Sequence, residues 1–444
     1  VKGTSLSVGG VRYPRGIWMN APCRIGLRGH WSKLRFTAKC GHEDLVQNAG
    51  YPAPRIRFMV RADDRIVFDS GYISSGEPAR AVDVAIFGVR TLELLLDSEN
   101  GVVGNAQGDW IDPVVEYEGD PPELDTPPPE SEPETGYPEN GYTSLQPGSR
   151  WHDTTGERIQ AHGGGLLRAG ERWWWFGEHK GGPTSFWPKS RVDIIGVGVY
   201  SSMDLYNWRN EGVVLPAEAD KPDSPLHPAN VLERPKVIFN RRTGKYVLWV
   251  KSENAHYAWH RALVAVADQP AGPYSIAASF QPGGRRFGDF ALYEEDGRGY
   301  LIFASGGTET TFIYSLSDDY LNVDREVASL YAGQKREAPA IATYDGLYFL
   351  ITSGKSGWAP NPTRYAVAPA LEGPWEDKGL LFADDSTRTS HRSQPTFLLE
   401  HEGRLIYLGD RWNQRDLGDS RYVWLPVEVS EGKLSCRWHD SWKL

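Results

Sequence analysis

The sequence lacks the features that mark several classes of protein. Its 444 residues contain no apolar run near the roughly 18 residues needed to cross a bilayer. The formal net charge is −10 and the pI is near 5.6. Because nucleic acids and anionic membranes attract basic surfaces, this balance argues against both as partners. We therefore expect no nucleic-acid partner and no membrane span.

Cysteine is scarce, and a helical pattern is missing. The three cysteines are Cys23, Cys40 and Cys436, and their spacing is not that of a metal site. Cys23 and Cys40 either pair or remain free, buried thiols. No long segment repeats apolar residues at the helical period. The sequence thus excludes a mainly helical fold.

Glycine, proline and aromatic residues are plentiful instead. The chain has 48 Gly, 31 Pro and 12% aromatic residues, which predicts an all-β protein rich in turns. A chain of 444 residues exceeds one ordinary core, so we expect two domains. The 17 tryptophans either pack in the core or stack on sugar rings, and both readings stay open at this stage.

Residues 1–118 alternate apolar and polar side chains. Period-two alternation with Gly, Asp and Asn breaks predicts short antiparallel strands, hence a jelly-roll-like β-sandwich. No paired carboxylates or histidine cluster stand out here, so we do not expect catalysis in this part. The clearest strands are Leu34–Ala38, Arg55–Val60, Arg65–Asp69 and Val82–Ile86.

The motifs GIWMNAPCRIGLRG, FMVRADDRIVFDSG, AVDVAIFGVRTLELLLDS and GDWIDPVV follow one another in this segment. In this order they resemble the NPCBM domain, a β-sandwich close to carbohydrate-binding module family 51. The resemblance implies binding of galactose-type sugars. One departure is Asn20 before Ala21, where the family often has His. Asp109 and Trp110 are candidates for a ligand patch, although a packed Trp110 is the favoured alternative.

Residues 119–148 change in composition. The stretch DPPELDTPPPESEPETGYPENG is dominated by proline and acids and has almost no apolar residues. Such a segment cannot bury a core and stays extended. We therefore predict a semi-rigid linker.

Residues 149–444 repeat one unit five times. In each copy a polar residue precedes Pro or Gly, an apolar strand follows, and an aromatic-rich strand comes after a Gly turn. Copies about 50 to 70 residues apart are typical of propeller blades, so we predict a five-bladed β-propeller. The copies begin at Gln160-Ala161-His162-Gly163, Glu233-Arg234-Pro235, Gly288-Asp289-Phe290, Glu337-Ala338-Pro339 and Gln394-Pro395.

The innermost strand of each blade lines the channel of a propeller, so the polar residues at these starts should meet at one end of it. A single acid is more often a solvated charge at a strand end. Three acids at matching positions, Glu233, Asp289 and Glu337, together with nearby aromatic residues, indicate glycoside hydrolysis.

From Trp151 to the C-terminus the chain resembles glycoside hydrolase family 43. The motifs IQAHGGGLL, WWWFGEHK, ERPKVIFN, REAPAI, TSGKSGWAPN and SQPTFLL are similar to its exo-β-1,3-galactanase branch. The family inverts anomeric configuration with a general acid Glu, a base Asp and an Asp that adjusts the pKa of the acid. The resemblance implies no required cofactor and leaves room for a structural calcium ion.

Carried over, the resemblance makes Glu337 the general acid and Asp289 its modulator. The first blade reads Ala161-His162-Gly163 where most of the family has Ala-Asp-Pro, so the base carboxylate is missing. The galactanase branch shares that absence, and its Gln at the position of Gln394 is proposed to handle the attacking water. An amide is a poor base, so Gln394 either orients water or reacts as an imidic acid with a proton relay. Glu233 is the alternative base.

Further residues are candidates for the sugar pocket. Glu178 and Glu233 resemble carboxylates that accept hydrogen bonds from sugar hydroxyls. His162 contacts substrate, holds a central ion or water, or is a packed core histidine. Trp358 is the best candidate for the pocket wall, because SGWAPN resembles the substrate-contacting loop of the branch. Tyr257, Asn361 and Trp412 are wall candidates with blade packing as the alternative, and Gln160 is a further candidate for substrate binding.

The resemblance thus implies a monomeric, secreted, periplasmic or cell-surface enzyme that trims β-1,3-linked galactose from plant-type arabinogalactan or another galactan. A β-galactofuranosidase and an α-L-arabinofuranosidase of the same family are alternatives, but these normally keep the first-blade Asp. A non-catalytic galactan-binding protein is an alternative of another class. A protein that only binds sugar has no use for an acid and its modulator. A third alternative, a protein-interaction scaffold, does not explain the ring of acids.

Overall fold

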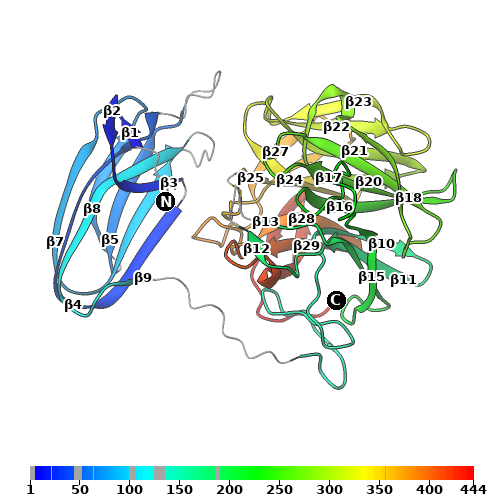
Figure 1. Ribbon diagram of the computed structural model, residues 1–444, viewed down its shortest axis with the longest axis horizontal. Helices are drawn as coiled ribbons and strands as arrows, with labels where there is room; N and C mark the ends of the chain where they lie inside the picture. The colour runs from blue at the N-terminus through cyan, green and yellow to red at the C-terminus, as the bar shows by residue number, and fades with distance from the viewer. Residues whose placement is uncertain are drawn as a thin grey trace. The chain divides into compact units, whose positions relative to one another are not determined.

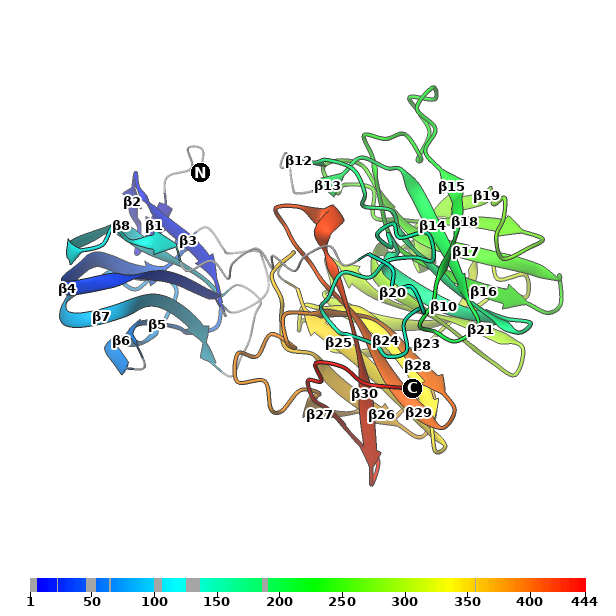
Figure 2. The same ribbon diagram turned by 90° about the horizontal axis from the view of Figure 1, so that it is seen from below.

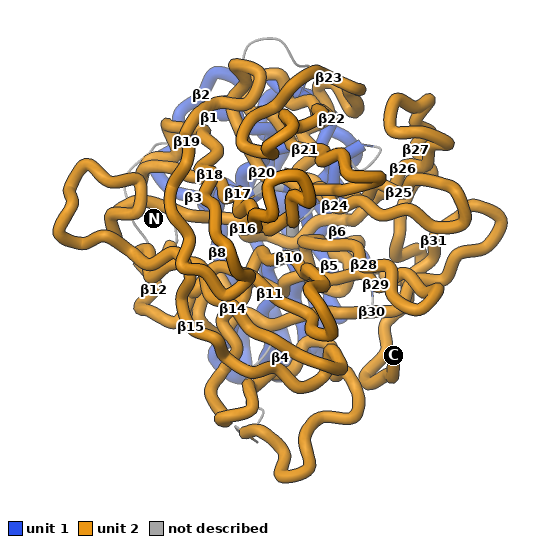
Figure 3. Tube along the Cα trace, turned by 90° about the vertical axis from the view of Figure 1, so that its right-hand side faces the viewer, with its two compact units in different colours: residues 1–132 blue, residues 133–444 orange. Residues whose placement is uncertain are grey.

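The computed structural model describes residues 6–21, 23–44, 53–63, 65–99, 106–124, 136–185, 191–355 and 357–444, without the side chains of residues 20, 23 and 24. Strands predominate in these ranges, which contain no α-helix. The chain divides into two compact units, residues 1–132 and residues 133–444 (Figure 3). The predicted all-β fold with two domains is confirmed.

The N-terminal unit is built around one large antiparallel sheet with the order β3-β8-β4-β7-β5-β6, and β9 pairs with β4 (Figure 1). A separate hairpin is formed by β1 and β2. The strands are β1 (Leu6–Val8), β2 (Val11–Tyr13), β3 (Gly16–Asn20), β4 (Cys23–His42), β5 (Ile56–Ala62), β6 (Arg65–Ile73), β7 (Arg80–Ser98), β8 (Gln107–Gly119) and β9 (Glu123–Leu124).

The sheet folds over on itself to make its own core. Trp110 of β8 is fully buried, and its ring lies 5.1 Å from Phe58 of β5 and 5.6 Å from Phe36 of β4, edge to face. The prediction of short strands is wrong for β4 and β7, which run for 20 and 19 residues. Register shifts in β4, at Arg28/Trp31 and Thr37/Lys39, let so long a strand bend.

Asp109 and Trp110, the candidates for a ligand patch, are buried, and the favoured alternative of a packed Trp110 is confirmed. Both side chains are completely buried, so neither can contact a sugar. Burial and the neighbouring Glu43 raise the pKa of Asp109 to about 9, which makes it a protonated core residue. Cys40 is a free, buried thiol. The side chains of Asn20 and Cys23 lie outside the described residues.

The C-terminal unit is the predicted five-bladed propeller, made of five four-stranded antiparallel sheets (Figures 1 and 2). The inner strands touch in the order β10, β16, β20, β24, β28 and back to β10, which closes the ring. The blades are β10 (His162–Ala169), β11 (Arg172–Glu178), β14 (Gly196–Ser202) and β15 (Arg209–Pro216); β16 (Val231–Asn240), β17 (Lys245–Glu253), β18 (Arg261–Ala267) and β19 (Ser275–Phe280); β20 (Arg286–Glu295), β21 (Arg298–Gly306), β22 (Thr310–Leu316) and β23 (Val323–Leu330); β24 (Arg336–Tyr344), β25 (Leu347–Gly354), β26 (Arg364–Ala368) and β27 (Glu376–Leu380); β28 (Gln394–His401), β29 (Arg404–Arg411), β30 (Arg421–Ser430) and β31 (Lys433–Cys436).

Part of the segment predicted as a linker belongs to the propeller. Leu145 is buried and exchanges backbone hydrogen bonds with Trp442, and the Tyr137 hydroxyl donates to Asn207 Oδ1 at 2.8 Å. At the other end of the predicted linker, β9 pairs with β4. Residues 136–148 therefore pack across the seam where the first and last blades meet. No helix in the described ranges is long and apolar enough to cross a membrane.

Tryptophans fill that seam. Trp175 has 2% of its surface exposed, and its ring lies 4.7 to 5.2 Å from those of Tyr422, Trp424 and Trp208. Trp151 adds a further ring at 6.2 Å. Trp173 is buried as well, so the prediction that at least one of Trp173, Trp174 and Trp175 packs between blades is confirmed.

We expect Trp175→Ala to lower the free energy of unfolding of the propeller by about 3–5 kcal/mol, because it removes a large ring and leaves a cavity. Trp18→Ala is the control, since Trp18 is 51% exposed and its loss should change stability by no more than about 0.5 kcal/mol. Denaturant unfolding of the full chain measures both. Equal, small losses would show that the seam repacks around the gap.

Candidate active site

The site begins with an irregularity that all five inner strands share. Each inner strand has a register shift near its start, where one or two residues have no partner on the second strand. These shifts lie at His162/Gly165, Glu233/Lys236, Phe287/Phe290, Glu337/Ala340 and Pro395/Phe397. Bulges re-aim side chains, and the starts predicted from the sequence coincide with these five.

Positive backbone angles accompany three of the bulges. Gly163, Arg234 and Ala338 have φ of 58°, 61° and 52°. Gly163 has a second reason to be glycine, because a Cβ there would lie 2.2 Å from Glu178 Oε1. At these positions the strained backbone breaks the alternation of the strand. The preceding polar residues, His162, Glu233 and Glu337, can then face side chains of other blades.

Gln394 lies at the centre of the polar cluster. Its Oε1 accepts hydrogen bonds from Trp412 Nε1 at 3.0 Å and from Arg234 Nη2, while its Nε2 donates to Glu337 Oε1 at 3.0 Å and to Ser353 Oγ at 3.3 Å. Indole and guanidinium groups only donate, so the amide oxygen must face them. Four partners therefore fix the orientation of the amide.

Glu337 is a half-buried carboxyl with a raised pKa. Burial and the neighbouring charge of Asp289 raise its pKa to about 8, against the opposing effect of Lys355 and Arg234. Glu337 is therefore protonated at neutral pH. The Gln394 amide donates to Oε1, which leaves Oε2 as the oxygen able to carry the proton.

Asp289 has the opposite charge state. Burial opposes its ionisation, but Arg234, Lys251 and Lys355 outweigh burial, so the pKa of Asp289 lies below its ordinary value. Arg234 Nη2 lies 3.3 Å from Oδ2, and Lys251 Nζ lies 3.5 Å from Oδ1. The site thus pairs an ionised aspartate with a neutral glutamate.

Glu233 is held by two donors. The Tyr257 hydroxyl donates to Oε1 at 2.6 Å, and Lys251 Nζ donates to Oε2 at 2.7 Å. Burial opposes the charge, while Lys251 and Lys180 favour it, so the pKa of Glu233 is lowered. Glu233 is an ionised acceptor with little tendency to take up a proton.

Glu178 closes the cluster on the side of the first blade. Its Oε1 accepts the backbone N–H of Arg234 at 2.8 Å, and Lys180 Nζ lies 2.7 Å from Oε2. Lys180 also lies 5.9 Å from the ring of Trp358, which meets Trp412 edge to face at 4.9 Å. Tyr257, Trp358 and Trp412 are half-buried, as expected of a pocket wall.

Three further predicted sugar contacts are buried and have protein partners. His162 is fully buried: Nδ1 lies 3.3 Å from Asp410 Oδ1, and the ring stacks on Tyr422. Asn361 is 2% exposed and donates to the carbonyls of Gly354 and Ala359. Gln160 is 7% exposed, and its Nε2 donates to Gly418 O at 3.0 Å. His162 and Asn361 therefore fit the alternative given above, in which they are packed residues of the fold.

Arg234 and Lys251 are part of the site, although the sequence analysis did not single them out. Arg234 is the middle residue of the ERP motif, and Lys251 lies directly opposite Glu233 in the register of β16 and β17. The sequence did offer a signal for Lys251, because a cation opposite an acid on two paired strands indicates an ion pair. The contacts of Arg234 with other blades have no signal in the sequence.

The channel beneath the site contains a lysine. Lys236 Nζ donates to Gly163 O at 2.7 Å, and Gly165 leaves room for its stem, since a Cβ there would lie 2.6 Å from Lys236 Cδ. Burial lowers the pKa of Lys236 to about 7. Within the described residues no group of three or more His, Cys, Asp or Glu side chains could hold a metal ion.

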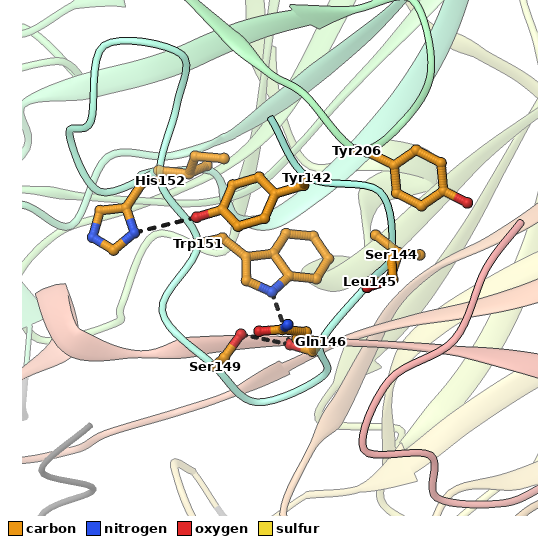
Figure 4. A pocket seen from close by; sticks show the side chains of 9 residues that line it. Tyr142, Ser144, Leu145, Gln146, Ser149, Trp151, His152 and Tyr206 are labelled. Carbon is orange, nitrogen blue, oxygen red and sulfur yellow. Dashed lines mark hydrogen bonds between the residues drawn. The ribbon is translucent and has the colours of Figure 1, made fainter. Parts of the chain in front are cut away.

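A small cavity lies away from this cluster, on the seam of the first and last blades. Tyr142, Trp151, His152 and Tyr206 line it, and the Trp151 indole donates to Gln146 O at 2.9 Å (Figure 4). Its volume is about 10 Å³, which is room for about one water molecule. This cavity is too small for a sugar.

Comparison with known proteins agrees with this geometry. Residues 185–418 match the model of glycosyl hydrolases family 43, and residues 1–116 match that of the NPCBM/NEW2 domain. The fold and the site define a glycosidase, and the chain belongs to glycoside hydrolase family 43 with an N-terminal NPCBM domain. A search of curated proteins finds no significant match.

Several solved structures are similar to the propeller. An exo-β-1,3-galactanase from Phanerochaete chrysosporium, with β-1,3-galactotriose, is 36% identical over 68% of this chain and 68% of its own, with a TM-score of 0.63. A family 43 β-1,3-galactosidase with galactodeoxynojirimycin is 31% identical over 68% and 100%, with a TM-score of 0.63. An exo-β-1,3-galactanase from Clostridium thermocellum is 35% identical over 67% and 66%, with a TM-score of 0.60.

We expect Asp289→Asn to lower the pKa of Glu337 from about 8 toward its ordinary range, because the negative charge that opposes ionisation is removed. Carbon-13 NMR titration of labelled glutamate measures this pKa, with Glu337→Gln to assign the signal. Lys355→Met is the matched control and should raise the same pKa. An unchanged value in Asp289→Asn would mean that burial alone sets it.

Proposed function

We propose that this glycosidase releases galactose from the end of β-1,3-galactan chains by an inverting mechanism. The observation that carries the proposal is the contact of a protonated Glu337 with an amide, Gln394, at 3.0 Å. Exo-β-1,3-galactanases among the similar structures support galactan as the substrate class.

Glu337 acts as the general acid in this proposal. A carboxyl that stays protonated near neutral pH can donate its proton to the glycosidic oxygen as the bond breaks. Asp289 remains ionised beside Arg234 and Lys251, and its charge keeps the proton on Glu337. The two carboxyls therefore have separate roles because their pKa values are pushed apart.

The attacking water is the second requirement. Inverting glycosidases leave room for water between acid and base, roughly 6.5–9.5 Å for a carboxylate pair. Here Gln394 touches Glu337 directly, so we propose that this hydrogen bond opens when substrate and water enter the site. We propose that Gln394 then orients the water, and that an imidic-acid form with a proton relay is the other route for the proton.

Glu233 is the less suitable base. Both of its oxygens already accept strong donors, Tyr257 and Lys251, and its pKa is lowered. A carboxylate so well stabilised accepts a proton poorly. We assign Glu233, with Glu178, to binding sugar hydroxyls.

The first blade favours a galactan over a furanoside. His162 occupies the place of the aspartate that furanosidases normally keep. The adjacent Asp410 is 1% exposed and is engaged by His162 and the backbone N–H of Gly163 at 3.0 Å, so it cannot replace that aspartate as base. We further propose that the polymer is arabinogalactan and that the reaction needs no cofactor. We also propose that the enzyme acts outside the cell as a monomer, and that its N-terminal sandwich binds galactose-type sugars.

Replacing Glu337 with Gln should lower kcat by at least about 10²-fold, because only proton donation is lost, while sugar binding is retained. In the unsubstituted enzyme, kcat/KM should fall as the pH rises through about 8, since the acid then loses its proton. Initial rates on β-1,3-galactobiose from pH 5 to 10 measure both. A rate that stays constant through this range would remove Glu337 as the acid.

The substrate assignment is tested by product analysis on linear β-1,3-galactan beside aryl galactofuranoside and arabinofuranoside, with Gln394→Ala in parallel. We expect galactose from the galactan, first as the α-anomer by proton NMR, and little release by Gln394→Ala. Release only from a furanoside would place the protein in the furanosidase branch and return Glu233 to the base position. No release from any substrate would indicate a binding protein.

A further inference from the structure

A groove lies on the second blade, outside the cluster of acids. Ala258, Trp259, Arg261, Ser279, Phe280 and Gln281 line it, and its volume is about 550 Å³. An open groove of this volume has room for a sugar ring. None of these residues belongs to the site described above.

The groove lies on the same end of the propeller as the site. Trp259 is in the loop that joins β17 to β18, and two residues earlier in that loop the Tyr257 hydroxyl reaches Glu233 at 2.6 Å. Phe280 ends β19, just before the inner strand β20 that carries Asp289. Two residues span at most about 7 Å of chain. The groove therefore lies close to the Tyr257 wall, in the same loop and at the same end of the blade.

The loop that forms the groove is held in place independently of any ligand. Glu253 is fully buried, and its Oε2 accepts the backbone N–H groups of Trp259 and His260, both at 2.9 Å. From the other side, Gln281 Nε2 donates to Trp259 O at 3.1 Å. A preorganised loop loses little entropy on binding, which favours a ligand-binding role.

The lining suits a pyranose ring. Trp259 and Phe280 are half-buried rings that can cover the apolar C–H face of a sugar, and Phe280 is held edge-on by Trp249 at 5.7 Å. Arg261 and Ser279 are exposed at the same groove and can donate to hydroxyls. Aromatic faces with polar groups at their edge match a neutral saccharide better than a lipid or a phosphate.

We propose that this groove binds further sugar residues of the galactan, outside the position of the terminal galactose. The inference rests on the proposed function. The sugars could come from the continuing β-1,3 backbone or from a β-1,6-linked branch, and both present the same pyranose faces to Trp259.

The test uses Trp259→Ala in the inactive Glu337→Gln background, with binding measured by calorimetry. Galactose, linear β-1,3-galactohexaose and a β-1,6-branched galacto-oligosaccharide are the ligands. We expect the preference for an oligosaccharide over galactose, taken as the ratio of Kd values, to fall about tenfold when the indole contact is lost. A fall with the linear ligand identifies the backbone, and a fall confined to the branched ligand identifies the branch.

Phe239→Ala is the matched control, because Phe239 is a half-buried aromatic at the other end of the same blade, beside Tyr246. It should leave the ratio unchanged, and Arg261→Ala gives a second variant should Trp259→Ala fold poorly. Unchanged ratios in both groove variants would overturn the proposal, as would an equal loss for galactose and oligosaccharides. Failure of the proposed function is distinct, since the unsubstituted enzyme would then release no galactose from galactan.

Discussion

One buried arginine, Arg234, links the five blades of the propeller, directly or through one further side chain. Arg234 belongs to the second blade. Its backbone N–H donates a hydrogen bond to Glu178 of the first blade, and its guanidinium pairs with Asp289 of the third. Its two Nη atoms donate to Gln394 and to the Pro395 carbonyl of the fifth blade, and Gln394 passes the connection to Glu337 of the fourth. An uncompensated buried charge is very costly, so these partners must be in place whenever the propeller is folded.

The cations are distributed unequally among the carboxyls, and this distribution separates their protonation states. Arg234 and Lys251 stabilise the charge of Asp289, while Lys251 and Lys180 stabilise that of Glu233. Glu337 receives less compensation, and burial and Asp289 raise its pKa. A single fold thereby holds an acid and several anions within one cluster, which is the condition for acid catalysis at neutral pH.

The fold was predictable because each blade repeats the same local pattern, and the positions of Glu233, Asp289, Glu337 and Gln394 followed from it. The burial of single side chains was harder to predict. Residue type does not tell whether Asp109 or Asn361 faces solvent, because this depends on how a sheet bends or a loop closes far along the chain. The role of Arg234 was equally hidden, since its partners come from segments up to 161 positions away.

An amide at position 394 has a physical advantage that the hydrogen bonds reveal. A carboxylate there would lie about as close to Glu337 as Nε2 does, 3.0 Å, and the two acids would share one proton, as paired carboxyls do. It would also lack the N–H groups that Glu337 and Ser353 now accept. The amide stays neutral, and its oxygen satisfies Arg234 and Trp412. Because the amide does not titrate, the proton on Glu337 is not shared with residue 394.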